Sequence, residues 1–348
     1  MTRSVDILFR VVRGGADFGE IYAMGNSTPR LRTSCNGSIH MSLSGDFADP
    51  GDSVDWSTDM IKPMLIIDGV EHSLGLLYVT TVQQVINEFT RYVHIEAFDQ
   101  CWFLKNYQTE SLLYYATADR YTPVISTLLS NAGIGSARIT PNLTLFGTAR
   151  EDWKIGTDYL TIINELLEEI NYSPIWFDAE GTAVIEPMPN PESGNIRHVL
   201  DEKDVKSLLI PEMSVNSDFY STPNVFKLIC SSPDRSTPLI ATATNTDGSS
   251  PISVPRRGRK IMKTIYVNNI GSQQDLQDMA DRMCRDTLIR TERISIKTGL
   301  LYGFELNELV ALNFAGESSI CIEKGWTMDL KPGGIMTHNM ERMVSAVG

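Results

Sequence analysis

The sequence predicts a β-rich α+β protein in which two strand-rich segments flank a small insert of helices and a hairpin. Apolar and polar residues alternate along much of residues 1–118, which is the period of strands. In residues 119–190 the apolar spacing becomes that of helices, and after residue 190 strand patterns return. These changes divide the 348 residues into three expected domains, 1–118, 119–190 and 191–348.

The first segment is expected to form a mainly antiparallel sheet or barrel. The stretches DILFRVV and GSIHMSL both alternate apolar and polar residues. Asp68 and Gly69 stand between two apolar runs, which is a strong signal for a hairpin. In RYVHIEAF, the apolar residues Val93, Ile95 and Ala97 share one face of the expected strand and would lie toward the core.

Two helices and a hairpin are expected in the insert. Thr122 as N-cap, Pro123 in the first turn and Gly133 at the end bracket a helix over residues 123–132. A second helix is expected over residues 157–170, because apolar residues recur there at helical spacing. Either Thr157 or Asp158 is expected to cap it. The stretch SPIWFDAEGTAVIEP then predicts two short strands around the turn DAEG.

Carboxylates gather in the second helix and in the hairpin turn, where they could form an acid/base site or a solvated surface. They are Glu165, Glu168, Glu169, Asp178 and Glu180. The three helical glutamates fall away from the apolar stripe, and aspartate is favoured in turns because its side chain bonds the local backbone. A catalytic carboxylate pair needs one member in a desolvating cleft. We therefore expect a solvated surface.

The last segment is expected to be a second strand-rich domain with one helix. Strand patterns occur in NVFKLICSS, PLIATATN, KTIYV, ELVALNF and SSICIEKGWTMDL. The helix lies in GSQQDLQDMADRMCRDTL, with Ser272 as its cap. A turn at Pro332, Gly333 and Gly334 precedes the final strand.

Composition and charge narrow the possible functions. A formal net charge of −13 argues against a protein that grips nucleic acid, since that affinity comes from lysine and arginine. No apolar run approaches the roughly 18 residues needed to span a bilayer, and the N-terminus does not resemble a signal peptide. The basic run PRRGRKIMK could be a phosphate patch, but its place between strand-like stretches favours a solvated turn. The five cysteines are widely spaced and form no C-x-x-C pair, which argues against disulfides and a zinc site.

No catalytic motif stands out. The sequence lacks the nucleophile elbow, the P-loop, the H-E-x-x-H pattern and the Rossmann glycine pattern. His40 lies near Ser42 and Ser44 in HMSLSG, but nothing orients it as a base, so it is interpreted as an edge-strand histidine. The other histidines, His72, His94, His198 and His338, are scattered singly. We therefore expect no catalytic residue, no metal ligand, no cofactor and no enzyme activity, and we assign no binding residue.

The order of segments resembles that of bacteriophage tail hub proteins, the baseplate-hub family of contractile and long non-contractile tails. The resemblance lies in YTPVISTLLSNAGI followed by EDWKIGTDYLTIINELLEEINYSPIWFDAEGTAVIEP, which is similar to the family's insert. VDWSTDMIKPMLIIDGVEHSLGLLYVTTV is similar to its early strands, and WTMDLKPGGIMTHNMER to its final hairpin. These patterns cover most of the chain. The resemblance implies two tube-type antiparallel β-barrel domains flanking the α+β insert.

The same resemblance implies a structural protein of the virion tail tip, assembled in the cytoplasm of the host bacterium. Three copies would form a ring that joins the tail tube and distal tail proteins to the receptor-binding or cell-puncturing parts. The tape measure protein and a tail fibre, spike or receptor-binding protein are further expected partners. DNA would pass through the channel without specific binding, which suits an acidic protein.

Two other classes of protein remain open from the residues alone. One is a β-rich carbohydrate-active hydrolase that uses two of the insert's carboxylates. The other is a sugar-binding adhesin module, in which tryptophans or the pair Tyr114 and Tyr115 stack on sugars. Turnover of peptidoglycan or capsule would indicate the hydrolase, and binding without turnover would indicate the adhesin.

Overall fold

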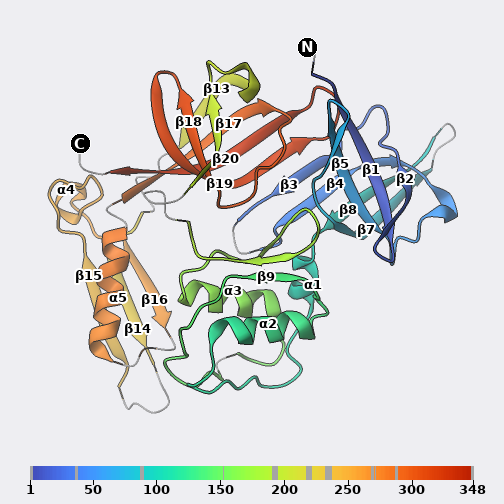
Figure 1. Cartoon of the computed structure of the whole chain (residues 1–348). Helices are drawn as coiled ribbons and strands as arrows, with labels where there is room; N and C mark the ends of the chain where they lie inside the picture. Colours follow the sequence, from blue (N-terminus) through green and yellow to red (C-terminus); the bar gives the residue numbers. More distant parts are fainter. Residues whose placement is uncertain are drawn as a thin grey trace.

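A large sheet built from both strand-rich segments dominates the computed structural model of the chain (Figure 1). The structure describes residues 3–35, 38–86, 90–151, 153–189, 195–216, 222–231, 237–267, 270, 272–286 and 289–345. Among these residues, fourteen strands belong to the large sheet. The β-rich α+β class expected from the sequence is confirmed.

Eight strands of the large sheet come from the first segment. They are β1 (Val5–Arg13), β2 (Ala16–Ile21), β3 (Arg30–Thr33), β4 (Met41–Ala48), β5 (Met60–Ile67), β6 (Val70–Ser73), β7 (Leu77–Ile86) and β8 (Arg91–Phe98). A short 3-10 helix covers Gly51–Ser53. The expected hairpin turn joins β5 to β6, with Asp68 and Gly69 at φ 50° and 81°, the left-handed values that such a turn requires.

Hydrogen bonds bring the first segment's sheet back onto itself. The strand order β4-β8-β7-β5-β1-β2 ends at β2. Beyond β2 the chain turns to the other edge of β4, where Ala23 forms a bridge with Phe47. The Met24 amide donates to the Asp46 carbonyl there at 2.9 Å. Strands β1–β8 therefore curl around a shared interior that contains Phe9, Phe47 and Ile95.

Six more strands come from the second segment. They are β12 (Ile196–Asp201), β13 (Leu209–Asn216), β17 (Ile289–Gly299), β18 (Leu309–Phe314), β19 (Glu317–Asp329) and β20 (Ile335–Ser345). A short 3-10 helix covers Val205–Ser207 between β12 and β13. All pair antiparallel except β12 with β18, which is parallel. The turn expected at residues 332–334 joins β19 to β20.

The two strand-rich segments are joined edge to edge in one sheet. Strand β3 of the first segment pairs antiparallel with β19 of the second, with Leu31 opposite Met328. One apolar core cluster also runs through both segments, from Phe9 to Met340. The sequence could not show this joining, because pairing between strands so far apart in the chain leaves no local signal. A division of this sheet into two tube-type barrels stays a prediction.

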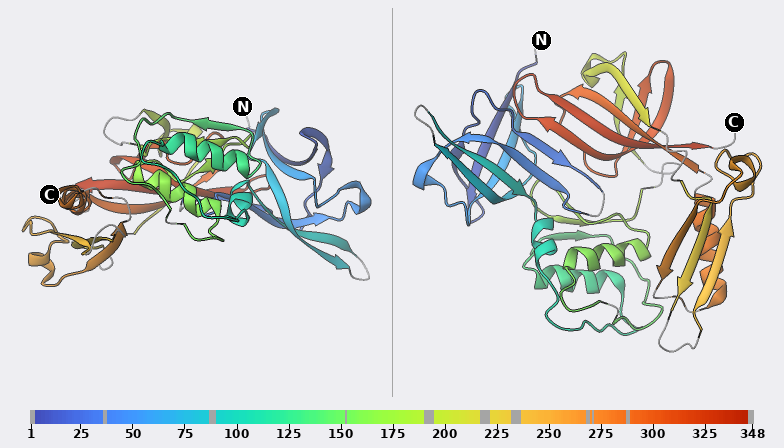
Figure 2. Two further views of the ribbon diagram at one scale, coloured as in Figure 1. Left: turned by 90° about the horizontal axis from the view of Figure 1, so that it is seen from below. Right: turned by 180° about the vertical axis from the view of Figure 1, so that it is seen from behind.

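The insert lies beneath the junction of the two segments (Figures 1 and 2). Its elements are α1 (Cys101–Asn106), α2 (Tyr121–Asn131), β9 (Ala137–Ile139), α3 (Tyr159–Glu169), β10 (Trp176–Phe177) and β11 (Ala183–Ile185). A separate apolar cluster holds them together, and it already includes Cys101 and Leu104 of α1. The insert therefore begins near residue 101, earlier than the expected 119, because α1 packs on its core.

Both expected insert helices are present, and each begins two residues away from its expected start. Helix α2 begins at Tyr121, and its N-cap Arg120 makes no capping hydrogen bond from its side chain. Thr122, the expected cap, is buried inside the first turn instead. Helix α3 is capped as expected by Asp158, whose side chain accepts from the Thr161 amide at 2.9 Å.

Residues 222–286 form a separate small unit, where the sequence analysis placed this stretch inside the second barrel. Its elements are β14 (Val225–Cys230), β15 (Leu239–Thr244), α4 (Val254–Arg257), β16 (Met262–Val267) and α5 (Gln273–Asp286). The three strands form their own sheet in the order β15-β14-β16, and α5 covers one face (Figure 2). Phe226, Leu228 and Leu276 belong to their own core cluster, so these strands do not need the large sheet. Ser272 bonds the Asp275 amide at 3.2 Å, as a cap should.

Among the described residues, no helix is long and apolar enough to cross a membrane. None of the five cysteines, all of which lie in the described part of the chain, forms a disulfide, and all but Cys35 are buried.

Candidate functional site at the junction of three segments

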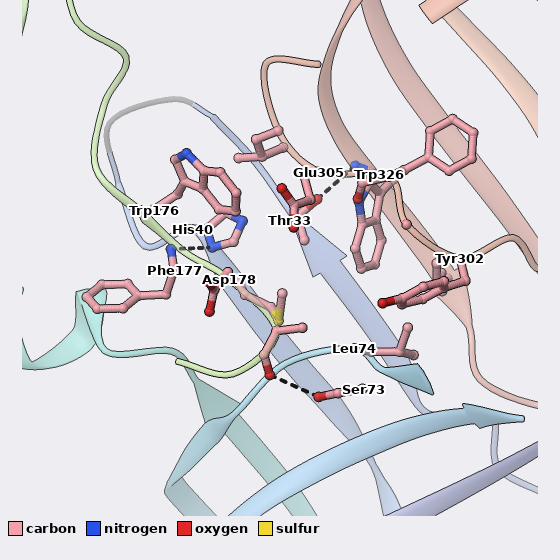
Figure 3. Close-up of a pocket in the computed structure, with 16 residues that line it drawn as sticks. Thr33, His40, Ser73, Leu74, Trp176, Phe177, Asp178, Tyr302, Glu305 and Trp326 are labelled. Carbon is pink, nitrogen blue, oxygen red and sulfur yellow. Dashed lines mark hydrogen bonds between the residues drawn. The ribbon is translucent and has the colours of Figure 1, made fainter. Parts of the chain in front are cut away.

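Both strand-rich segments and the insert meet around one small pocket (Figure 3). The first segment contributes Thr33, His40, Met41, Ser73 and Leu74; the insert contributes residues 176–179; the second contributes residues 302–306, Trp326 and Met328. The pocket volume is about 60 Å³. That is room for about two water molecules, whereas pockets for small molecules measure roughly 300–1,000 Å³. The size of this particular pocket therefore fits a structural contact between segments better than a sugar-binding cleft.

A buried contact between a histidine and an aspartate fixes the start of the insert. His40 Nδ1 lies 2.9 Å from Asp99 Oδ2, and the two side chains are 4% and 3% exposed. The carboxylate of Asp99 also accepts from the backbone amides of Met41 and Cys101, both at 3.1 Å. The amide of Phe177 lies 3.4 Å from His40 Nδ1 (Figure 3). His40 is thus a buried joint residue, and its interpretation as an edge-strand histidine beside serines was wrong because it precedes β4 and turns inward.

The hairpin turn of the insert is held by the first segment. Ser73 Oγ donates to the Ala179 carbonyl at 2.9 Å, and Gln100 Nε2 donates to the Gly181 carbonyl at 2.6 Å. Lys62 pairs with Glu180 at 2.9 Å. Within the turn, Asp178 accepts from the backbone amides of residues 180 and 182, as expected for a turn aspartate. These carboxylates therefore shape and anchor the turn.

The second segment closes the other side of the pocket. The Trp326 amide donates to Thr33 Oγ1 at 3.1 Å, which ties β19 to β3 (Figure 3). The Trp326 indole donates to the Phe304 carbonyl at 2.9 Å. His72 of the first segment stacks on Tyr302 with ring centroids 4.0 Å apart. Polar and aromatic contacts thus link all three segments at the pocket.

Acidic side chains are partly desolvated beside the pocket. Burial raises the pKa of Glu305, and the nearby charge of Glu308 raises it further. Burial likewise raises the pKa of Glu186. Burial would also raise the pKa of Glu308, but the hydrogen bond from His198 and other favourable contacts outweigh it and lower that pKa. His198 Nε2 lies 3.0 Å from Glu308 Oε2.

A second buried contact between a histidine and a carboxylate lies inside the large sheet. His338 Nδ1 is 2.8 Å from Glu323 Oε2, and both side chains are fully buried. Thr298 Oγ1 lies 3.1 Å from His338 Nε2. Among the described residues, Glu323 Oε1 has no hydrogen-bond partner. The pair tethers β17, β19 and β20 to one another.

The glutamates of α3 are exposed, as expected, but two of them also hold buried groups. Glu165 accepts from the Trp153 indole at 2.7 Å. Glu169 accepts from Arg150 at 2.8 Å and from the Tyr121 hydroxyl at 2.7 Å, although Arg150 is only 2% exposed. The expectation of a purely solvated face was therefore incomplete. The loop before α3 folds over that face, and loop paths have no periodic sequence signal.

The structure brings together a serine, a histidine and an aspartate that the sequence analysis did not connect. Across β4 and β8, His94 Nδ1 lies 2.7 Å from Asp46 and His94 Nε2 lies 3.4 Å from Ser44 Oγ. The second distance exceeds the roughly 2.6–3.2 Å of a nucleophile–base hydrogen bond. His94 and Asp46 also keep 35% and 36% of their side-chain surface exposed. The alternating sequence of β4 and β8 predicts which residues share one face of each strand. It does not predict which residues of the two strands lie opposite each other, so this contact could not be foreseen.

The remaining candidates form no metal centre. Among the described residues, no group of three or more histidines, cysteines, aspartates or glutamates is placed to hold a metal ion. The basic run occupies α4 and the start of β16, at the edge of the small unit.

Comparison with known proteins finds similar structures but no similar sequences. No family model and no curated protein matches the sequence. The chain is similar to the structure of a tail protein from Neisseria meningitidis MC58, with a TM-score of 0.71 and 12% identity over 98% of both chains. It is also similar to the 43 kDa tail protein of prophage MuSo2 from Shewanella oneidensis, with a TM-score of 0.66 and 11% identity over 99% of both chains.

A third similarity is to a Francisella PdpA-VgrG complex, with a TM-score of 0.57 and 9% identity over 98% of this chain and 58% of that chain. At such identities the similarity establishes a shared fold. The chain therefore has the fold of phage tail proteins, as the resemblance in the sequence implied.

Proposed function

We propose that this chain is the tail hub of a phage or phage-tail-like particle. The observation that supports this proposal is the similarity to a tail protein and to a prophage tail protein over almost the full length of each chain. The similarity includes the insert and the small unit, so it is not limited to a generic β-sheet. The three segments meet around a pocket with room for only about two water molecules. A close contact of this kind between segments is what a rigid structural subunit needs.

The hub would be a ring of three copies. Each chain presents two strand-rich segments joined through β3 and β19. Three copies give six such segments, which would match the hexameric tail tube that the resemblance to tail hub proteins implies. Strands β2 and β13 lie at the two ends of the main strand path of the sheet, and cyclic assembly is one way to cover ends of that kind.

The ring would join the tail tube and distal tail proteins to a fibre, spike or other receptor-binding part, with the tape measure protein as a further contact. Its central channel would let DNA pass. The net charge of −13 supports a lining that does not retain phosphates. Enzyme activity is not part of this proposal.

Cryo-electron microscopy of purified particles would test the assembly. We expect three copies of the chain in a ring at the tail tip, around a channel wide enough for duplex DNA. Six copies, a lining dense in lysine and arginine, or absence of the chain from the particle would contradict the proposal.

A further inference from the structure

Among the described residues, strand β16 is an open edge of the small unit. It pairs in parallel with β14, from Met262 opposite Val225 to Val267 opposite Cys230, and the described sheet ends there. The opposite edge, β15, is covered by helix α5. Gln273 Nε2 donates to the Ile240 carbonyl at 3.0 Å, and Gln277 Nε2 donates to the Thr242 carbonyl at 3.3 Å. One edge is thus occupied by helix side chains, whereas β16 keeps a row of backbone groups facing outward.

Apolar side chains accompany this open edge on the face away from α5. Met262 and Tyr266 of β16 are 53% and 75% exposed. The register places Ile240, Ile229 and Tyr266 side by side across the three strands. Ile240 is itself 47% exposed. This row offers a neighbouring strand an apolar surface on one side of the sheet.

Basic side chains surround the beginning of the same strand. Arg256, Arg259, Lys260 and Lys263 are all exposed. The backbone that carries them is fixed, because the fully buried Asn224 donates to the Arg259 carbonyl at 3.0 Å and accepts from the Ile261 amide at 2.7 Å. A protein with a net charge of −13 thus presents a concentrated positive patch beside its open strand edge.

We propose that the β16 edge binds an extended acidic segment of a partner protein by strand addition. The segment's backbone pairs with β16, its carboxylates lie beside Lys260 and Lys263, and its apolar residues lie beside Met262 and Tyr266. Charge complementarity selects an acidic occupant, and the outward backbone groups select an extended peptide. Nucleic acid would use the positive charges but neither the backbone groups nor the apolar row, and the overall negative charge opposes its approach. This proposal does not depend on the trimeric ring.

The probe is a fluorescent synthetic peptide with three glutamates followed by five alternating valines and threonines, measured by fluorescence anisotropy with the full chain. We expect binding that weakens with salt, and no binding by the matched peptide with lysines in place of glutamates. The variant Lys260→Glu/Lys263→Glu should lose about tenfold in affinity. The matched variant Lys203→Glu/Lys206→Glu, at exposed lysines outside the small unit, should bind as the native chain does, and circular dichroism should show that both variants are folded.

Two N-methylated forms of the glutamate peptide separate strand addition from simple charge attraction. Methylation of alternate amides blocks one edge of a strand, so one form should lose binding and the other should keep it. Equal binding by both forms would overturn the proposal. It would also be overturned by no binding up to about 1 mM, or by equal or tighter binding of a short duplex DNA or of phosphatidylglycerol vesicles through Lys260 and Lys263.

Discussion

Gly325 of β19 lies so close to Thr33 of β3 that a Cβ atom at residue 325 would stand 2.6 Å from the Thr33 carbonyl oxygen. That distance is too short for any side chain, so glycine is what allows the two segments to meet here. Gly325 follows a register shift in the pairing of β19 with β20, which brings the β19 backbone toward β3.

Replacement of Gly325 with alanine should therefore destabilise the joint. We expect a loss of about 2 kcal/mol in the free energy of unfolding, measured by urea denaturation, because the backbones of β3 and β19 must move apart. Gly19→Ala is the matched control, since nothing lies within 4 Å of a Cβ built at that exposed position. Equal effects of the two substitutions would contradict this account of the junction.

Glu169→Ala should destabilise the insert much more than Glu168→Ala. The first substitution removes an acceptor from the buried Arg150 and should cost about 1–3 kcal/mol in the free energy of unfolding. The second alters an exposed side chain on the same helix and should stay within about 0.5 kcal/mol. Similar losses for both variants would mean that Glu169 does not support Arg150.

The contribution of Glu305 to the stability of the chain should fall as the pH rises through the range in which this acid ionises. Burial raises the folded-state pKa of this acid, so the folded chain binds its proton more tightly than the unfolded chain does. The protein therefore loses stability between the ordinary pKa of glutamate and the raised value. Glu305→Gln should be more stable than the native chain at about pH 8 and should lose that advantage near pH 4, the ordinary range for glutamate.

Urea unfolding at both pH values measures this difference, with Glu168→Gln at an exposed position as the control. An advantage of Glu305→Gln that does not change with pH would show that ionisation is not its cause.

Ser44 should not act as a nucleophile. The 3.4 Å separation from His94 and the exposure of the base give no activation of the hydroxyl. A fluorophosphonate probe should label a standard serine protease but not this chain. Labelling that disappears in Ser44→Ala and persists in Ser42→Ala would reveal an active site on this sheet and would revive the hydrolase alternative.

Local sequence patterns predicted much of the fold, because the relevant forces act between near neighbours. Alternation located β8, the pair Asp68 and Gly69 located a hairpin turn, and Asp158 located the start of α3. What the sequence did not show depends on contacts between distant residues. The pairing of β3 with β19 and the parallel pairing of β14 with β16 are both of this kind.

The candidate site was harder to predict for the same reason. His40 and Asp99 are 59 residues apart, and neither stands in a recognisable motif. Residues of the pocket come from three segments whose meeting depends on the whole topology.

The place of the small unit in the chain has an evolutionary consequence. It lies between β13 and β17, which are antiparallel neighbours with Asn216 opposite Arg293. The chain thus leaves the large sheet and returns to it at adjacent points, as it would in an ordinary hairpin loop. Recombination could exchange this unit for another, or remove it, without changing the order of strands in the large sheet. Chains that share this large sheet could in this way carry different small units at the same point.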